Sequence, residues 1–150
     1  MLKLLIGLAL WWAAHFLKRV APGVRGKMVA AVGEKPVKAV VGIVLIGAVV
    51  LLVKGFEQAT YTPVYTPIPG IGHLNNALML VAIFVFGIGM AHGRLSARVR
   101  HPMLLGVILW AFAHLLVNGD LASIVLFGGL GVWAVLQIWL INRAEGAWVR

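Results

Sequence analysis

Hydrophobic residues occur in five long runs along this chain, and short polar or Gly/Pro-rich segments separate them. In order, the runs are roughly Leu2–Leu17, Val37–Val53, Leu74–Ala91, Pro102–Val117 and Leu121–Ile141. Each is near the ~20 residues that a helix needs to cross ~30 Å of hydrocarbon. Because lipid offers no partners to backbone polar groups, we expect helices rather than open strands. The pattern predicts an all-α integral membrane bundle of five transmembrane helices.

Composition agrees with a membrane protein. Hydrophobic residues make up 62% of the 150 positions and charged residues only 11%, whereas a soluble domain carries about 25% charged residues. At this length we expect one domain, residues 1–150, without a separate soluble module. The absence of cysteine excludes disulfides, thiolate metal sites and cysteine nucleophiles.

The basic residues gather in alternate connections between the runs. Six lie between the first two runs, and three lie between the third and fourth; two more, Arg143 and Arg150, lie in the tail, while the segment Gly55–His73 has none. By the positive-inside rule the N-terminus is outside and the C-terminus is cytoplasmic. This topology, with contact to anionic lipid, accounts for most of the net charge of +9 without nucleic acid as a partner.

Two connections have a recognisable character. The segment from Tyr61 to Asn76 contains several prolines, which fix φ and remove donors, so we expect it not to be helical. Tyr61 and Tyr65 suit the membrane interface. It is either a connector, which we favour, or a lid over a site on the outer side. The basic segment Ala21–Pro36 alternates apolar and charged residues, which indicates a short surface helix.

Candidate chemistry rests on histidines. The chain has five, at positions His15, His73, His92, His101 and His114. Acidic residues number four and none lies in the middle of a run, so a zinc hydrolase or a di-iron carboxylate site is poorly supported. No nucleophile elbow, P-loop or dinucleotide fingerprint occurs.

Two of the histidines follow a tryptophan by four residues: His15 follows Trp11, and His114 follows Trp110. Each pair shares one helix face. A polar side chain inside a membrane usually faces the bundle interior and has a function, and imidazole is a common ligand of haem iron. The alternative is a neutral histidine bonded to a nearby carbonyl. His101 lies about 19 Å along the helix from His114 and on roughly the opposite face, so these two cannot bind one iron.

Two short motifs allow a structural interpretation beside a functional one. In Asn118-Gly119-Asp120 the first two residues end one helix and Asp120 caps the next, or the turn lies near a cofactor carboxylate. In Arg100-His101-Pro102 the proline favours a helix start, or the motif binds a cofactor.

The stretch RVRHPMLLGVILWAFAHLLVNGDLASIVLFGG resembles the NnrU family of bacterial membrane proteins. The shared pattern is RHP, a glycine four residues after the proline, WA-x-x-HLL-x-NGD and LFG, and the resemblance extends over essentially the whole chain. It implies a multi-pass protein of the bacterial cytoplasmic membrane that is associated with denitrification and nitric oxide metabolism.

The plant and cyanobacterial relatives of that family are 15-cis-zeta-carotene isomerases, which are haem b membrane proteins. The resemblance implies a haem with His15 and His114 as axial ligands, and we expect Trp11, Trp110 and Gly106 to line its pocket. Where the isomerases carry a cysteine, this chain has Ala111, which puts carotenoid isomerase activity in doubt. Any enzyme activity would be that of a haem-dependent isomerase or redox enzyme.

The predicted topology leaves the ligand pair open. In straight helices His15 and His114 would differ by about 13 Å in depth. On depth alone His114 pairs better with His73, and His15 with His101 or His92. We keep His15 and His114 first, with His73 and His101 as second candidates.

Three functions follow from these observations. The first is redox or small-ligand chemistry at a histidine-ligated haem, with a redox or reductase partner and a small gas or apolar ligand. The second is a methyltransferase related to the isoprenylcysteine methyltransferases, in which the RHP segment, here Arg100 and His101, helps to bind S-adenosylmethionine. The third is a non-catalytic assembly or regulatory factor.

Overall fold

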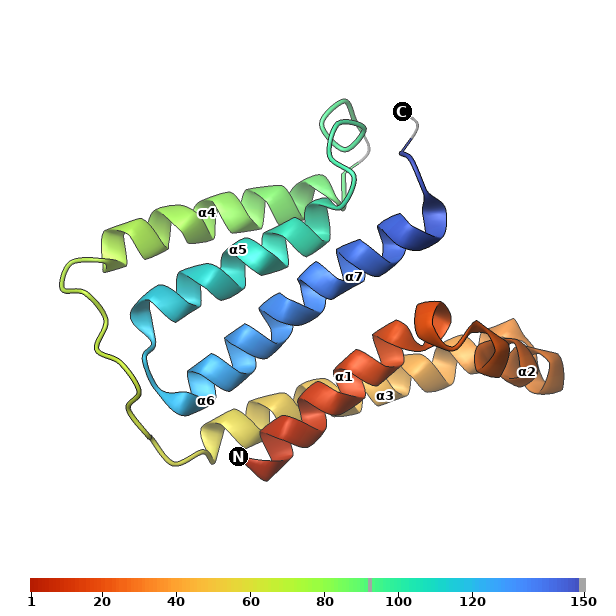
Figure 1. The fold of residues 1–150 in the computed structure, drawn as a ribbon, viewed down its shortest axis with the longest axis horizontal. Coiled ribbons are helices and arrows are strands. Elements are labelled where there is room, and N and C mark those ends of the chain that lie inside the picture. The colour runs from red at the N-terminus through yellow and green to blue at the C-terminus, as the bar shows by residue number, and fades with distance from the viewer. Residues whose placement is uncertain (92, 149–150) are drawn as a thin grey trace. The chain divides into compact units, whose positions relative to one another are not determined.

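The computed structural model describes residues 1–91 and 93–148, so His92 and Arg150 lie outside the described residues. The described part is helical and contains no strand beyond a single bridge between Pro63 and Asp120 (Figure 1). The elements are α1 (Leu2–Val20), α2 (Pro22–Val32), α3 (Glu34–Glu57), α4 (Gly72–Ile88), α5 (Pro102–Val117), α6 (Leu121–Ser123), the π-helical turn η1 (Ile124–Gly128) and α7 (Gly129–Glu145). The predicted all-α class is confirmed.

The chain divides into two compact units, and the first comprises Met1–Thr60. In it α1 and α3 approach closely because glycines stand at the crossing. A Cβ added to Gly7 would lie 2.9 Å from the backbone nitrogen of Leu52 and 3.0 Å from the carbonyl oxygen of Ala48. Gly55 fits in the same way against the backbone of Leu4, which is fully buried. Small residues at helix contacts are typical of membrane bundles.

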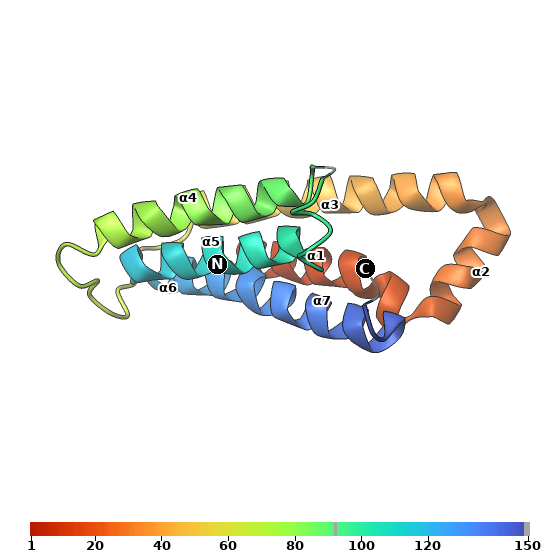
Figure 2. The same ribbon diagram turned by 90° about the horizontal axis from the view of Figure 1, so that it is seen from above.

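The helix α2 forms a right angle with α1. The two helices are bent by 90° at Ala21, and Pro22 occupies the first turn of α2, where its missing N–H costs nothing. Figure 2 shows α2 running between the far ends of α1 and α3. The short helix predicted within Ala21–Pro36 is therefore present.

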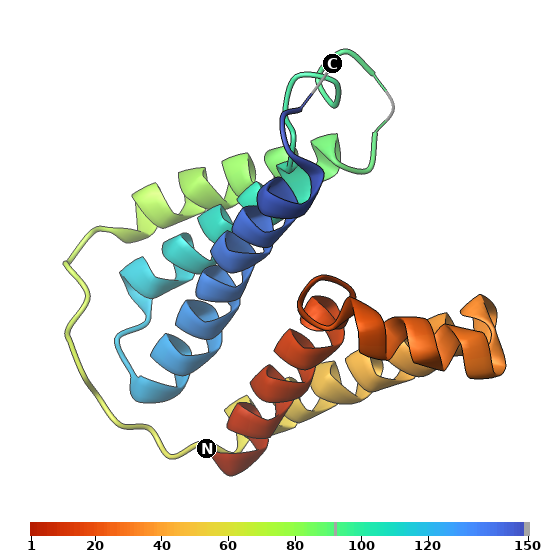
Figure 3. The same cartoon turned by 45° about the vertical axis from the view of Figure 1, so that its right-hand side comes forward.

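The second unit comprises Tyr61–Arg150. In it α4 and α5 lie side by side, and α5 also packs against α7 (Figure 3). Gly106 permits the contact between α4 and α5, since a Cβ there would lie 2.8 Å from the Cβ of Phe86. In the contact between α5 and α7, Gly131 lies opposite Ala111, and a Cβ on Gly131 would lie 3.3 Å from that of Ala111. The last hydrophobic run is one helical stretch made of α6, η1 and α7.

Helix length separates the predicted spans into two groups. Two stretches, α3 with 24 residues and Leu121–Glu145 with 25, are long and apolar enough to cross a membrane, and α1 with α2 adds a third if the bent pair counts as one span. The apolar helices α4 and α5 have 17 and 16 residues. A helix of 16 residues is about 24 Å long, short of the ~30 Å hydrocarbon core. Five spans and their orientation therefore remain predictions.

The surface is that of a protein in lipid. Many large hydrophobic side chains are exposed along the helices, whereas much of the buried set consists of alanine and other small residues. A membrane environment removes the cost of exposing apolar side chains, and close helix packing then depends on small residues. The arrangement supports a helical membrane protein.

Candidate functional site

The side chain of His114 is held on two sides within the second unit. Its Nδ1 lies 2.9 Å from the carbonyl oxygen of Trp110, one turn earlier in α5. Its ring stacks on Phe127 with 4.3 Å between centroids and 23° between planes. Trp110 contacts both rings, at 4.8 Å from His114 and 5.0 Å from Phe127. Since the carbonyl can only accept, Nδ1 carries the proton and the lone pair belongs to Nε2.

Phe127 reaches this position from the π-helical turn η1. The turn covers Ile124–Gly128, and the Phe127 side chain within it is 7% exposed. Single π-helical turns inserted in α-helices occur often at functional sites. Sequence reasoning missed Phe127, because an apolar residue in an apolar run carries no signal of a π-helical turn.

His15 repeats the same local arrangement in the first unit. Its Nδ1 lies 2.9 Å from the carbonyl oxygen of Trp11, and the ring centroids of the two side chains are 4.3 Å apart. The prediction that the tryptophan and the histidine share a helix face is thus confirmed for both pairs. A bond from Nδ1 to a carbonyl is compatible with both interpretations of these histidines, because it also sets the tautomer and ring orientation of metal-ligating histidines.

The remaining candidates have different surroundings. His15 and His114 belong to separate units, so their pairing on one haem stays a prediction. His73 is exposed in the first turn of α4. His101 forms a hydrogen bond with Asn142 in α7, with 2.8 Å between its Nε2 and Oδ1 of the asparagine. Gly106 serves the contact with Phe86 described above.

The Arg100-His101-Pro102 motif ties the start of α5 to the end of α7. Besides the bond between His101 and Asn142, the Arg100 guanidinium donates to the carbonyl of Gly146 at 2.8 Å. Pro102 is the first residue of α5, as predicted from its place in the sequence. These contacts give the motif a structural role, and cofactor binding by Arg100 and His101 stays a prediction.

An apolar groove lies on the surface of α5, η1 and α7. Its volume is about 320 Å³, and its lining includes Ala111, Phe127 and Gly131. Phe127 therefore borders both the groove and the histidine ring. The groove suits an apolar ligand rather than a charged one.

Residues Tyr61–Tyr65, here called the strap, cross the turn that follows α5. The backbone N–H groups of Val64 and Tyr65 donate to the carbonyl of Gly119 at 2.8 and 3.0 Å, and the N–H of Leu121 donates to Thr62 at 2.8 Å. The Tyr65 hydroxyl is shared between the carbonyls of Leu115 and Asn118. Burial and the charge of Asp120 raise the pKa of Tyr65, so the hydroxyl keeps the proton that it donates. The predicted connector is thus bonded to the turn, but the expectation that it is non-helical as far as Asn76 was wrong, because α4 begins at Gly72, after the last proline of the segment.

The Asn118-Gly119-Asp120 turn has the capping role that its residues predict. Asn118 ends α5, and its side chain donates to the carbonyl of His114 at 2.8 Å. Asp120 caps α6, accepting from the backbone N–H of Ser123 at 3.0 Å and lying 2.5 Å from its hydroxyl. Burial raises the pKa of Asp120, but the bonds from Ser123 and neighbouring N–H groups outweigh burial and hold the pKa below its usual value.

Among the described residues, no group of three or more His, Asp or Glu side chains is placed to hold a metal ion. A haem iron needs only two protein ligands in its axial positions, so the candidate ligands here are single histidines on separate helices.

Comparison with known proteins gives one match. A family model described as NnrU protein matches residues 3–150. No curated protein and no solved structure was found to match the chain.

Proposed function

The chain belongs to the NnrU family, and from that premise we propose that it binds haem b through His15 and His114. We further propose that it crosses the bacterial cytoplasmic membrane five times, with its N-terminus outside. His15 and His114 would hold the iron, and a bound haem would supply electron transfer or a binding site for a small gas or an apolar ligand. Its physiological setting is denitrification and nitric oxide metabolism, with a reductase or another redox protein as partner.

The repeated Trp-His arrangement is the observation that supports this proposal. In both pairs Nδ1 of the histidine lies 2.9 Å from the carbonyl of the tryptophan four residues earlier. That bond leaves Nε2 with the lone pair, as an axial ligand requires. Such a bond also fixes the ring and raises the basicity of the ligating nitrogen. The residues therefore fit a haem ligated by two histidines.

The surrounding side chains would exclude water and hold the rings. Trp110 and Phe127 enclose the imidazole of His114, and Trp11 lies against that of His15. A hydrophobic shell around a metal site controls solvent access and the local dielectric, and through them the reduction potential. The groove that Phe127 lines offers room for an apolar ligand, and the same ring stacks on His114.

Absorption spectroscopy of the purified protein tests the proposal. We expect haem b reconstitution to give a Soret band with the visible bands of a six-coordinate, bis-histidine haem. His15→Ala and His114→Ala should each abolish that spectrum, and added imidazole should restore it in part. His73→Ala is the matched control and should leave it unchanged. A wild-type protein without a Soret band, or a spectrum unchanged in both His15→Ala and His114→Ala, would overturn the proposal.

The proposed topology has its own test, since the chain contains no cysteine. Single cysteines introduced at Val64 and at Lys27 should label from opposite sides of the membrane in intact cells, with Val64→Cys accessible from outside. Labelling of both from the same side would contradict five spans.

A methyltransferase is not proposed, because internal contacts already account for Arg100 and His101. Both side chains bond to α7 or to the residue that follows it.

A further inference from the structure

The segment that contains the short helix α2 carries a strong net positive charge. The sequence from Lys18 to Lys38 contains six basic residues and a single acidic one, Glu34, a net charge of +5 from six minus one. At right angles to α1, α2 runs across the end of the helical pair rather than along it (Figure 2). If α1 crosses the membrane, α2 lies parallel to the membrane surface.

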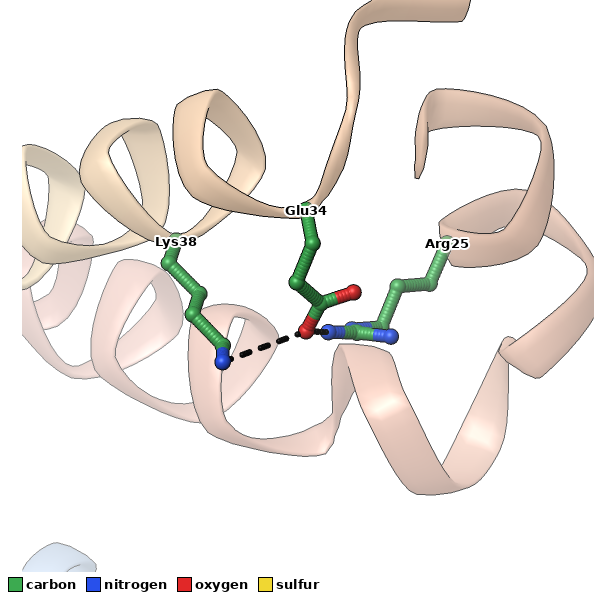
Figure 4. A network of polar contacts seen from close by, with 3 residues as sticks. All are labelled: Arg25, Glu34 and Lys38. Carbon is green, nitrogen blue, oxygen red and sulfur yellow. Dashed lines mark hydrogen bonds and ion pairs between the residues drawn. The ribbon is translucent and has the colours of Figure 1, made fainter. Parts of the chain in front are cut away.

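The one carboxylate of this segment joins α2 to α3. A carboxylate oxygen of Glu34 accepts from the Arg25 guanidinium at 2.6 Å and lies 3.4 Å from Nζ of Lys38 (Figure 4). Arg25 belongs to α2, whereas Glu34 and Lys38 belong to the first turns of α3. These contacts hold α2 against the start of α3, and they occupy the only carboxylate of the segment.

Three lysines remain outside that network. Lys18, Lys27 and Lys35 are exposed, and none has an ion-pair partner among the residues that the structure describes. Their ammonium groups are therefore available to an external anion.

The exposed side of α2 combines charge with apolar surface. Val24, Lys27 and Ala31 are spaced at i, i+3 and i+7, so they share a face, and all three are exposed. The apolar stem of a lysine can lie along apolar surface while its ammonium group extends toward the phosphates.

From this arrangement we propose that α2 lies on the membrane surface and that Lys18, Lys27 and Lys35 bind the phosphate groups of anionic lipids. Polybasic segments beside a transmembrane helix gain affinity for anionic headgroups with each basic residue near the surface. The proposal does not depend on haem binding.

Lipid retention measured by native mass spectrometry tests the proposal on the whole detergent-solubilised protein. Phosphatidylglycerol should bind in preference to phosphatidylcholine, and added salt should weaken only the former. The double variant Lys27→Gln/Lys35→Gln should lose affinity for phosphatidylglycerol about fivefold per lysine removed. The control Lys3→Gln/Lys54→Gln removes the same charge near the other end of α1 and α3 and should retain the affinity. Equal losses in both double variants, or equal binding of the two lipids by the wild type, would contradict the proposal.

A second measurement reports on the place of α2 even if the lysine variant folds poorly. A spin label at Val24→Cys in phosphatidylglycerol vesicles should collide more with oxygen than with a water-soluble nickel complex, as at the interface. A label at Val64→Cys, in the strap, should show the opposite preference. If Val24→Cys is as water-accessible as Val64→Cys, α2 does not lie on the membrane.

Discussion

The hydroxyl of Tyr65 lies 2.8 Å from the carbonyl oxygen of Asn118, and it also donates to the carbonyl of Leu115 in the last turn of α5. Carbonyls at a helix end have no partner within the helix, so this side chain satisfies groups that α5 cannot. Tyr65→Phe should therefore lower the free energy of unfolding by about 1 kcal/mol. Chemical denaturation in detergent measures it. Tyr61 is 74% exposed, so Tyr61→Phe is the control and should change little.

Gly119 should tolerate no side chain, because a Cβ there would meet the carbonyl of Tyr65. Gly119→Ala should separate the strap from the turn and cost about 1–3 kcal/mol, as overpacking does. Limited proteolysis by chymotrypsin, which cleaves after aromatic residues, should become faster in the strap. Gly72→Ala is the control, since a Cβ at Gly72 meets nothing within 4 Å. Equal cleavage of the two variants would contradict the prediction.

Asp120 should make stability depend on pH. Its pKa in the folded protein lies below the usual value, so the ionised group stabilises the fold above about pH 4, the unfolded pKa, and this contribution is lost as pH falls through the folded pKa. Asp120→Asn keeps a good capping residue but removes the charge. The thermal midpoint of the wild type should exceed that of the variant at pH 7, and the difference should shrink at pH 3. A difference that is the same at both pH values would refute this.

Gly7 should be needed for the contact between α1 and α3. Gly7→Ala places a methyl group 2.9 Å from the backbone nitrogen of Leu52, which cannot move as a side chain can. We expect a loss of about 1–3 kcal/mol in unfolding free energy. Gly47→Ala in α3 meets no atom within 4 Å and should be neutral or slightly stabilising, because alanine favours helix more than glycine does. Parallel denaturation curves decide between the two outcomes.

Phe127 should act as a positioning residue for the His114 imidazole. Phe127→Leu keeps an apolar side chain but removes the stacked ring, so the imidazole should sample more orientations and both tautomers. Nitrogen NMR of the haem-free protein, with ¹⁵N-labelled histidine, measures the tautomer ratio. Phe86→Leu, on the other side of α5 near Gly106, is the control. An unchanged His114 signal in Phe127→Leu would assign Phe127 to packing alone.

Local chemistry explains which parts of the fold were predictable. The cap at Asp120, the start of α5 at Pro102 and the Trp-His faces each depend on residues within one or two turns, and each is present in the structure. The five apolar runs likewise became helices. Their number as membrane spans stays a prediction. Hydropathy does not say where a helix ends, and α4 stops at Ile88, three residues before the end of its apolar run.

Contacts between distant residues were not predictable from one sequence. Tyr65 had suggested only a membrane interface, whereas its hydroxyl bonds a residue 53 positions away. The bond from His101 to Asn142 spans 41 positions. The role of Gly7 and Gly55 depends on how α1 crosses α3, which the sequence does not show. In the candidate site the histidines were found from their spacing, and the ring that stacks on His114 was not.

The π-helical turn η1 changes how the last hydrophobic run should be interpreted. A residue added to an α-helix rotates everything after it by about 100°. The residues before and after η1 therefore follow different helical phases. A single helical-wheel projection of Leu121–Glu145 would assign some residues to the wrong face of the helix. Removing one residue from Ile124–Gly128 would restore a continuous α-helix. It would also rotate Trp133 and Ala134, which are both buried, away from the residues that they now contact.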